Sequence, residues 1–157
     1  VSISGFDTHD NQVDANNHIV GEHANLLHQL SDAIEAFMRD LKMLGLSHRV
    51  VGMTFSEFGR RITSNSSLGT DHGAAAPTFM FGAPIQGGIT GENPFIPQSA
   101  NYWDNIPMQY DFRSLYATVL KDWFCLENQD LQSVMLDQYD TLPVINAGSC
   151  MTTSTRE

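Results

Sequence analysis

A long amphipathic helix is the feature that most restricts how this chain can fold. Residues 22–44 carry apolar side chains at helical spacing, and these form one broad stripe: Leu26, Leu27, Leu30, Ile34, Phe37, Met38, Leu41 and Leu44. Polar and charged residues occupy the opposite face. Gly45 follows, and a glycine readily takes the left-handed conformation that ends a helix. The pattern therefore predicts one helix from about Glu22 to Leu44.

Short apolar runs on both sides of this helix predict strands. Residues 1–6 read as a strand already under way, and residues 49–55 are apolar enough to be buried on both faces of a sheet. A strand, a crossover helix and a second strand form a βαβ unit, whose strands are parallel. A third apolar run covers residues 78–81. We therefore expect an α/β fold in which helices flank a mostly parallel sheet.

The second half of the chain is less regular. Residues 82–110 are rich in glycine, proline and amides, and loops of that length are often functional. Asp111 is placed as an N-cap for a helix that continues to about Phe124. Residues 142–145 can form a short strand or turn. We expect residues 1–145 to form one α/β domain, and residues 146–157, rich in Ser and Thr, to form a disordered tail.

Composition narrows the function classes. The 157 residues carry a net charge of −10 with only 8 Lys and Arg, which argues against nucleic acid as a partner. No apolar run approaches the ~20 residues needed to span a bilayer. The two cysteines, Cys125 and Cys150, are too few for a disulfide scaffold but could pair in an oxidising compartment. Because the chain opens within a predicted strand, we expect it to be a fragment of a longer protein.

Three polar clusters follow the predicted strands and should meet at one edge of the sheet. Asp7-Thr8-His9 follows the first strand, Ser56-Glu57 follows the second, and Asp71-His72 lies on the loop that leaves the second strand. In parallel α/β sheets, ligands bind outside the carboxyl ends of the strands. The convergence of these clusters predicts a binding site there.

Two of these clusters suit a divalent metal. In an extended segment Asp7 and His9 point the same way and can chelate one ion, although Asp7 could instead cap a turn beside an exposed His9. The adjacent Asp71 and His72 offer oxygen and nitrogen ligands between two glycines. Both clusters therefore supply candidate metal ligands.

The third cluster combines a carboxylate with cations. Glu57 is followed by Arg60 and Arg61, and the guanidinium fork of an arginine matches phosphate or sulfate oxygens. The same residues could instead form a structural salt bridge at the end of a strand. The sequence contains no nucleophile elbow, dinucleotide fingerprint or P-loop lysine that would favour another enzyme class.

As a set, these motifs resemble a bacterial sulfatase-like family of the alkaline phosphatase superfamily. The matching segments are Gly5–Gln12, Thr54–Arg61, Gly69–Gly73 with Pro77, and Asp111–Leu120. The resemblance implies a doubly wound, three-layer sheet and a metal centre that hydrolyses phosphate or sulfate esters. Asp7 and His9 resemble the first ligand pair, and His72 resembles the late histidine before a proline. Ser56-Glu57 stands where that superfamily has Asp-His.

The resemblance further implies the carboxy-terminal portion of a periplasmic or secreted hydrolase. Asp7, His9 and His72 would bind the metal, with Glu57 and Asp71 as ligands or as partners of the ligands. Arg60 would hold the oxyanion of a small anionic ester. Zinc suits these ligands, while calcium and manganese stay open. The nucleophile would come from the N-terminal part of the same protein, so this chain alone should be inactive. The alternative is a non-catalytic binding or assembly protein with an eroded metal site.

Overall fold

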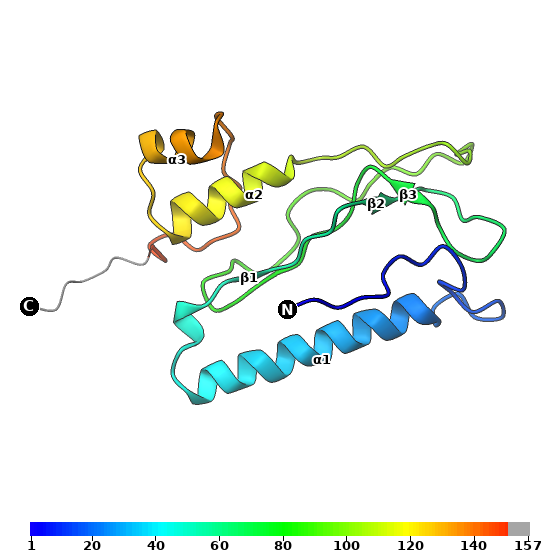
Figure 1. Ribbon diagram of the computed structural model, residues 1–157, viewed down its shortest axis with the longest axis horizontal. Coiled ribbons are helices and arrows are strands. Elements are labelled where there is room, and N and C mark those ends of the chain that lie inside the picture. The colour runs from blue at the N-terminus through cyan, green and yellow to red at the C-terminus, as the bar shows by residue number, and fades with distance from the viewer. Residues whose placement is uncertain (151–157) are drawn as a thin grey trace, which may run out of the picture. The chain divides into compact units, whose positions relative to one another are not determined.

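The computed structural model describes residues 1–150 of the chain (Figure 1). The chain divides into two compact units, each assembled from separated segments. Unit 1 comprises Val1–Gly45, Thr54–Thr78 and Asn93–Met108. Unit 2 comprises Leu46–Met53, Phe79–Glu92 and the chain from Gln109 onward.

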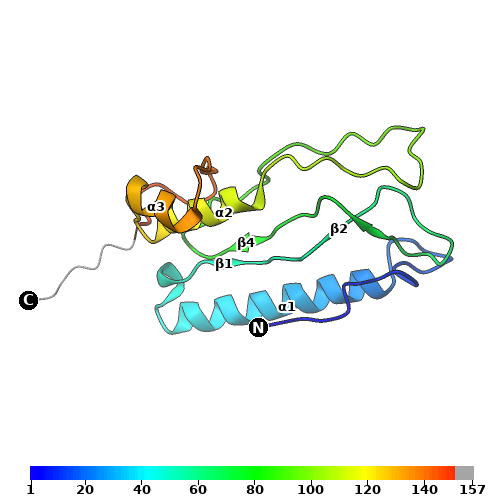
Figure 2. The same ribbon diagram turned by 45° about the horizontal axis from the view of Figure 1, so that its top comes forward.

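Unit 1 contains the long helix α1 (Glu22–Met43), which confirms the helix predicted from the apolar spacing. It ends as expected, with Gly45 in the left-handed region at a φ of 69°. The N-terminal segment runs beside α1 (Figures 1 and 2), where Gly5 lies against the buried Leu26. Among the described residues, no helix is long and apolar enough to cross a membrane.

Unit 1 also contains a short pair of antiparallel strands. Strand β2 (Gly59–Arg60) pairs with β3 (His72–Gly73), and Arg60 lies opposite His72. The two segments of the chain approach so closely that a Cβ atom on Gly59 would lie 2.0 Å from the carbonyl oxygen of Ala75. Only glycine fits such an approach. This pairing places residues just after the predicted strand 49–55 beside residues that precede the apolar run 78–81.

Unit 2 is built around a small apolar core. Its buried members are Trp123, Leu142, Val144 and Ile145, with Val51, Met80, Ile85, Leu115 and Val119 packed against them. Strand β1 (Gly52–Met53) pairs antiparallel with β4 (Met80–Phe81), and an isolated bridge joins Ile85 to Ile145. The predicted strand or turn at residues 142–145 thus supplies much of this core.

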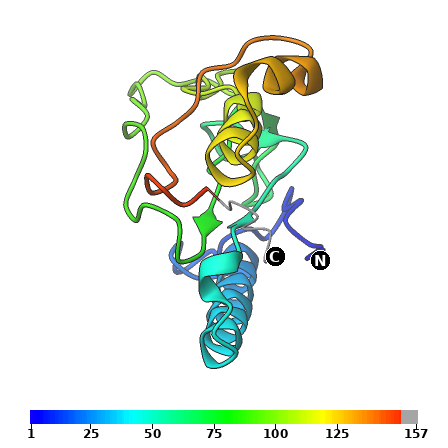
Figure 3. The same cartoon turned by 90° about the vertical axis from the view of Figure 1, so that its left-hand side faces the viewer.

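Three helical elements and a disulfide complete unit 2, together with the short 3₁₀ turn η1 (Ser47–Arg49). The predicted helix after Asp111 is confirmed as α2 (Phe112–Thr118), continued by a π-helical turn, η2 (Val119–Trp123). Helix α3 (Asn128–Met135), which the sequence reading missed, lies next to α2 (Figures 1 and 3). Cys125 and Cys150 form a disulfide. Residues 151–157 of the predicted tail lie outside the described residues.

The predicted three-layer α/β fold with a mostly parallel sheet is wrong. Both pairs of named strands in the described residues are antiparallel and only two residues long on each side. Residues 1–6 form no strand, and Gly5 interrupts them at a φ of 104°. The predicted strand at residues 49–55 contributes β1, which pairs antiparallel with β4 and not in parallel with residues 1–6. Apolar runs of strand length predicted extended chain but could not fix its partners.

Asp111 provides a pH-dependent contribution to stability that can be measured. Its carboxylate accepts hydrogen bonds from the backbone N–H and the guanidinium of Arg113, and this pairing lowers the pKa of Asp111 from 3.8 to about 2. A carboxyl group whose pKa is lowered by folding stabilises the folded state at pH values above its ordinary pKa. This stabilisation is lost as the pH falls through the lowered pKa of about 2.

We therefore expect the free energy of unfolding of the wild type to exceed that of Asp111→Asn above pH 4, and the difference to decrease steadily as pH falls from 4 to 2. Asparagine keeps the helix cap but cannot titrate in this range, which makes it the matched variant. Denaturant titrations from pH 2 to 6 measure the difference. A difference independent of pH would refute the assignment.

Candidate metal centre

Unit 1 brings most of the sequence-predicted site residues together. Asp7 and His9 lie in the segment before α1, and Arg60 lies on β2. His72 begins β3, and Asp71 directly precedes it. Ligand atoms of Asp7, His9 and His72 lie within 4.8 Å of one another. Glu57 is exposed and does not belong to this cluster.

The carboxylate of Asp7 is the centre of the cluster. Its Oδ1 atom lies 2.9 Å from Nε2 of His72, 2.9 Å from Nη2 of Arg60 and 3.1 Å from Nε2 of His9. The hydrogen bond with His72 lowers the pKa of Asp7 most, and the hydrogen bond from Arg60 lowers it further. Asp7 therefore offers a full negative charge to whatever lies between the two imidazoles.

Each of the two ring nitrogens of His9 lies close to the oxygen of a different carboxylate. Its Nδ1 lies 2.9 Å from Oδ1 of Asp71, and its Nε2 lies 3.1 Å from Oδ1 of Asp7. An ionised carboxylate only accepts hydrogen bonds, while a neutral imidazole carries a single proton. Both nitrogens are satisfied if the ring is an imidazolium, or if one nitrogen carries a proton and the other a metal ion. The position therefore accommodates either a second proton or a metal ion at Nε2.

The two distances from Asp7 suit a small divalent ion, and the ligand atoms of His9 and His72 lie within 4.8 Å of each other. Ligands about 2.0–2.1 Å from a tetrahedral zinc ion lie roughly 3.3 Å from one another, close to the separations around Asp7. The side chains of His9 and His72 are 46% and 48% exposed. Three protein ligands open to solvent would leave one coordination position of a bound zinc ion free.

Asp71 is held by donors in addition to His9. The hydroxyl of Tyr102 donates to its Oδ2 atom, and Nδ2 of Asn65 lies 3.3 Å from its Oδ1 atom. These contacts, led by Tyr102, lower the pKa of Asp71 to about 2 and raise the pKa of the tyrosine. Sequence reasoning missed both partners. Tyr102 lies in the long 82–110 segment, which predicted function without indicating a residue.

His72 is fixed by an aromatic ring. Phe58 stacks on the imidazole of His72 with centroids 3.7 Å apart and planes 11° from parallel. The guanidinium of Arg60 lies 5.1 Å from the same phenyl ring. Sequence reasoning treated Phe58 only as part of a motif, because stacking partners cannot be read from spacing. The ring limits how far His72 can turn away from Asp7.

Arg60 joins the segments that carry the ligands. Besides its bond to Asp7, it donates from Nη2 to the carbonyl of Phe6 at 2.7 Å and from Nη1 to the carbonyl of Thr70 at 2.6 Å. Its side chain is only 21% exposed. The hydrogen bonds made by both Nη atoms give Arg60 a positioning role. Its predicted role in holding a substrate oxyanion stays a prediction.

The backbones on either side of the site also meet directly. A Cβ atom on the buried Gly69 would lie 2.2 Å from the carbonyl carbon of His9. The hydroxyls of Thr8 and Thr70 both donate to Oε1 of Gln12, at 3.1 and 2.7 Å. The loop that carries Asp7 and His9 therefore packs against, and is hydrogen-bonded to, the segment that precedes His72.

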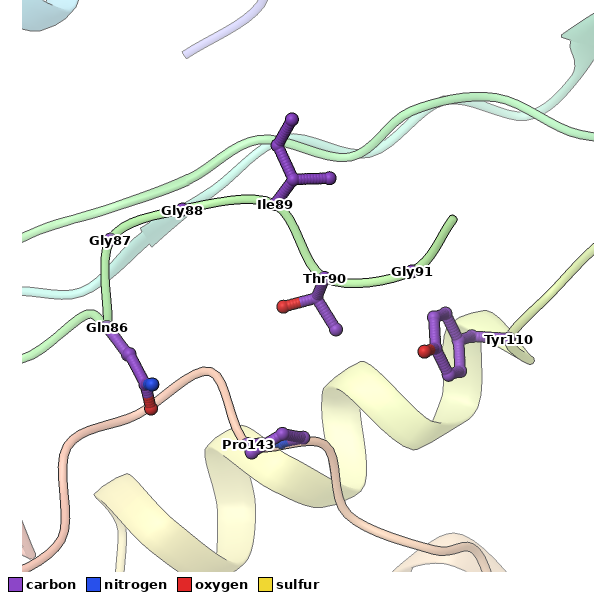
Figure 4. A pocket seen from close by; sticks show the side chains of 8 residues that line it. All are labelled: Gln86, Gly87, Gly88, Ile89, Thr90, Gly91, Tyr110 and Pro143. Carbon is purple, nitrogen blue, oxygen red and sulfur yellow. The ribbon is translucent and has the colours of Figure 1, made fainter. Parts of the chain in front are cut away.

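Unit 2 has an open depression that offers little comparable chemistry. It measures about 320 Å³, and Figure 4 shows its lining residues: Gln86, Gly87, Gly88, Ile89, Thr90, Gly91, Tyr110 and Pro143. These residues include no carboxylate, imidazole, thiol or basic group. The candidate site is therefore the cluster around Asp7.

Comparison with known proteins now places the chain. A family model described as a protein of unknown function (DUF1501) matches residues 1–135. The chain belongs to the DUF1501 family. All the residues of the candidate metal centre, including Tyr102, lie within the part that matches DUF1501. No curated protein and no solved structure matches the chain.

The DUF1501 match corrects the resemblance drawn from the motifs. The family shown is DUF1501 and not a sulfatase or alkaline phosphatase family, so the predicted membership in the alkaline phosphatase superfamily is wrong. Short polar motifs such as Asp-x-His and Asp-His suit metal binding in many folds, so they cannot by themselves establish a superfamily. For this DUF1501 chain, function has to be argued from the geometry of the site.

Proposed function

We propose that this chain binds one divalent metal ion through Asp7, His9 and His72 and so contributes the metal centre of a hydrolase of phosphate or sulfate esters. The observation that carries the proposal is the setting of His9, whose two ring nitrogens each face a carboxylate oxygen. A single proton cannot satisfy both nitrogens, whereas a second proton or a metal ion at Nε2 can, and the neighbouring ligand atoms of Asp7 and His72 suit the metal ion. Zinc suits this donor set best, with manganese and calcium as alternatives.

The chemistry follows from the open coordination position. A bound divalent ion polarises an ester oxygen or lowers the pKa of a bound water. Asp7 holds a negative charge against the ion, His9 and His72 supply nitrogen ligands, and Arg60 holds Asp7 in place. A small anionic ester would reach the site from solvent, since the ligands are half-exposed.

The disulfide supports a location outside the cytoplasm. Cys125 and Cys150 are paired, and such bonds persist mainly in oxidising compartments. We therefore include a periplasmic or secreted location in the proposal.

Metal binding is the direct test. We expect calorimetric titration of the chelator-treated chain to show one zinc ion per chain, bound more tightly than manganese or calcium. His72→Ala should weaken zinc binding by more than the roughly 10–100-fold that loss of a ligand's hydrogen-bond partner costs. His48→Ala is the matched control, because His48 is an exposed histidine on η1, outside the cluster.

Two results would contradict the metal proposal: a wild type that binds no zinc, or equal affinities for the wild type and His72→Ala. Either would favour a non-catalytic binding or assembly protein. That alternative has a specific basis, because an imidazolium at His9 would satisfy Asp7 and Asp71 without any metal.

A further inference from the structure

We infer that Tyr102, acting through Asp71, is a positioning residue that holds His9 with its Nδ1 proton on Asp71 and its Nε2 turned toward Asp7. The inference rests on the proposed metal function for its purpose, since it assigns Nε2 as the nitrogen that binds the ion. Tyr102 lies outside the three polar clusters predicted from the sequence, so the inference adds a residue to the site.

The contacts form a continuous chain of hydrogen bonds. The hydroxyl of Tyr102 donates to Oδ2 of Asp71, and the other carboxylate oxygen, Oδ1, accepts from Nδ1 of His9 at 2.9 Å. Asn65 supports both ends, because its Nδ2 lies 2.8 Å from the carbonyl oxygen of His9 and 3.3 Å from Oδ1 of Asp71. The two oxygens of Asp71 thus serve different partners, and the carboxylate cannot rotate without breaking one bond.

Tyr102 is itself held firmly. Nη1 of Arg61 donates to the carbonyl of Tyr102 at 3.1 Å, and Nε of Arg61 donates to the carbonyl of His72 at 3.2 Å. The guanidinium also lies 5.4 Å from the Tyr102 ring and 4.9 Å from the ring of Trp103. Arg61 therefore links the 93–108 segment to the strand that carries His72. Asp71, at 24% exposure, lies deeper than Asp7 at 55%.

The arrangement decides which nitrogen of His9 is free for a metal. The tautomer of a histidine is set by the hydrogen bond that its other nitrogen makes, and a carboxylate partner fixes the ring and increases its basicity as a ligand. Without Asp71, the ring could turn about its Cβ–Cγ bond or carry its proton on Nε2. Either change would remove the lone pair from the space between Asp7 and His72.

Nitrogen-15 NMR of the metal-free chain tests the positioning independently of any metal. We expect a slowly exchanging proton on Nδ1 of His9 in the wild type, whether or not Nε2 is also protonated. That signal should disappear in Asp71→Ala and exchange faster in Tyr102→Phe. Tyr110→Phe is the matched control, since it removes a phenol from unit 2 and should leave the signal unchanged.

Zinc titration supplies the second readout. We expect Tyr102→Phe to bind zinc about 10-fold more weakly than wild type, at the low end of the roughly 10–100-fold known for such partners. The visible spectrum of the cobalt-loaded variant should also shift. Amide spectra of each variant establish that it is folded, and Asp71→Ala judges the inference if Tyr102→Phe does not fold.

The two proposals fail separately. If the wild type binds zinc but lacks the Nδ1 proton signal, or if Tyr102→Phe matches Tyr110→Phe in both readouts, the positioning role is overturned and the metal site stands. If the Nδ1 signal behaves as expected but zinc does not bind, the positioning of His9 is upheld and the metal function is overturned.

Discussion

Asp7→Ala is expected to abolish zinc binding by the chain, the largest loss of function among the substitutions considered. Asp7 supplies the oxygen ligand and also connects His9, His72 and Arg60 through one carboxylate oxygen. Its removal would leave the two imidazoles without a shared anion and the guanidinium with only carbonyl partners. We expect a loss greater than the roughly 100-fold that marks the upper end for outer partners of ligands.

Asp10→Ala provides the control for Asp7→Ala. Asp10 is an exposed carboxylate three residues further along the same segment, and it is not part of the ligand cluster. It removes the same charge and should leave zinc affinity within a factor of about two, because surface charges interact weakly through water. Calorimetric titration of both variants decides the matter. Equal losses in the two would show that general negative charge, not the geometry at Asp7, attracts the ion.

Gly69→Ala is expected to have the largest effect on stability, and to weaken metal binding as well. A Cβ atom there would lie 2.2 Å from the carbonyl carbon of His9 and 2.6 Å from the backbone nitrogen of Asp10. Backbone atoms cannot move aside as a flexible side chain can, so the loop carrying His9 has to shift. We expect a loss of roughly 1–3 kcal/mol in the free energy of unfolding, the usual cost of overpacking.

The matched substitution is Gly87→Ala. Nothing lies within 4 Å of a Cβ atom at Gly87, and its φ is not in the left-handed region. Alanine there should leave stability unchanged or raise it by up to about 1 kcal/mol, because it reduces the freedom of the unfolded chain. Denaturant unfolding and zinc titration of both variants test the comparison. A Gly69→Ala variant as stable as Gly87→Ala would disprove the close approach.

The features that could be predicted from the sequence are those that depend on residues close together in the chain. The helix α1 was predicted almost to its last residue, because helical hydrogen bonds join neighbours four residues apart and the spacing of apolar residues records them. The Asp111 cap was predicted for the same reason. Strand pairing is non-local, and nothing in residues 49–55 or 78–81 indicated that β1 and β4 would pair antiparallel.

In the candidate site, too, contacts between residues distant in the sequence could not be predicted. The sequence grouped Asp7, His9, His72 and Arg60 through an expected parallel sheet that residues 1–150 do not form, yet these four residues do lie together. They meet because Arg60 pairs with His72 across β2 and β3 and bonds to the carbonyl of Phe6. Tyr102 lies 31 residues beyond Asp71, so no local pattern could have revealed its contact.

The interleaving of the two units has a consequence for how this chain can be divided. Its path changes unit after residues 45, 53, 78, 92 and 108, so each unit is completed only when distant stretches have all been made. No single cut releases either unit as a continuous polypeptide. Gene fusion or recombination after residue 53, 78 or 92 would leave both units incomplete. The ligands on the 1–45 and 54–78 segments and the tyrosine on the 93–108 segment therefore have to be inherited together.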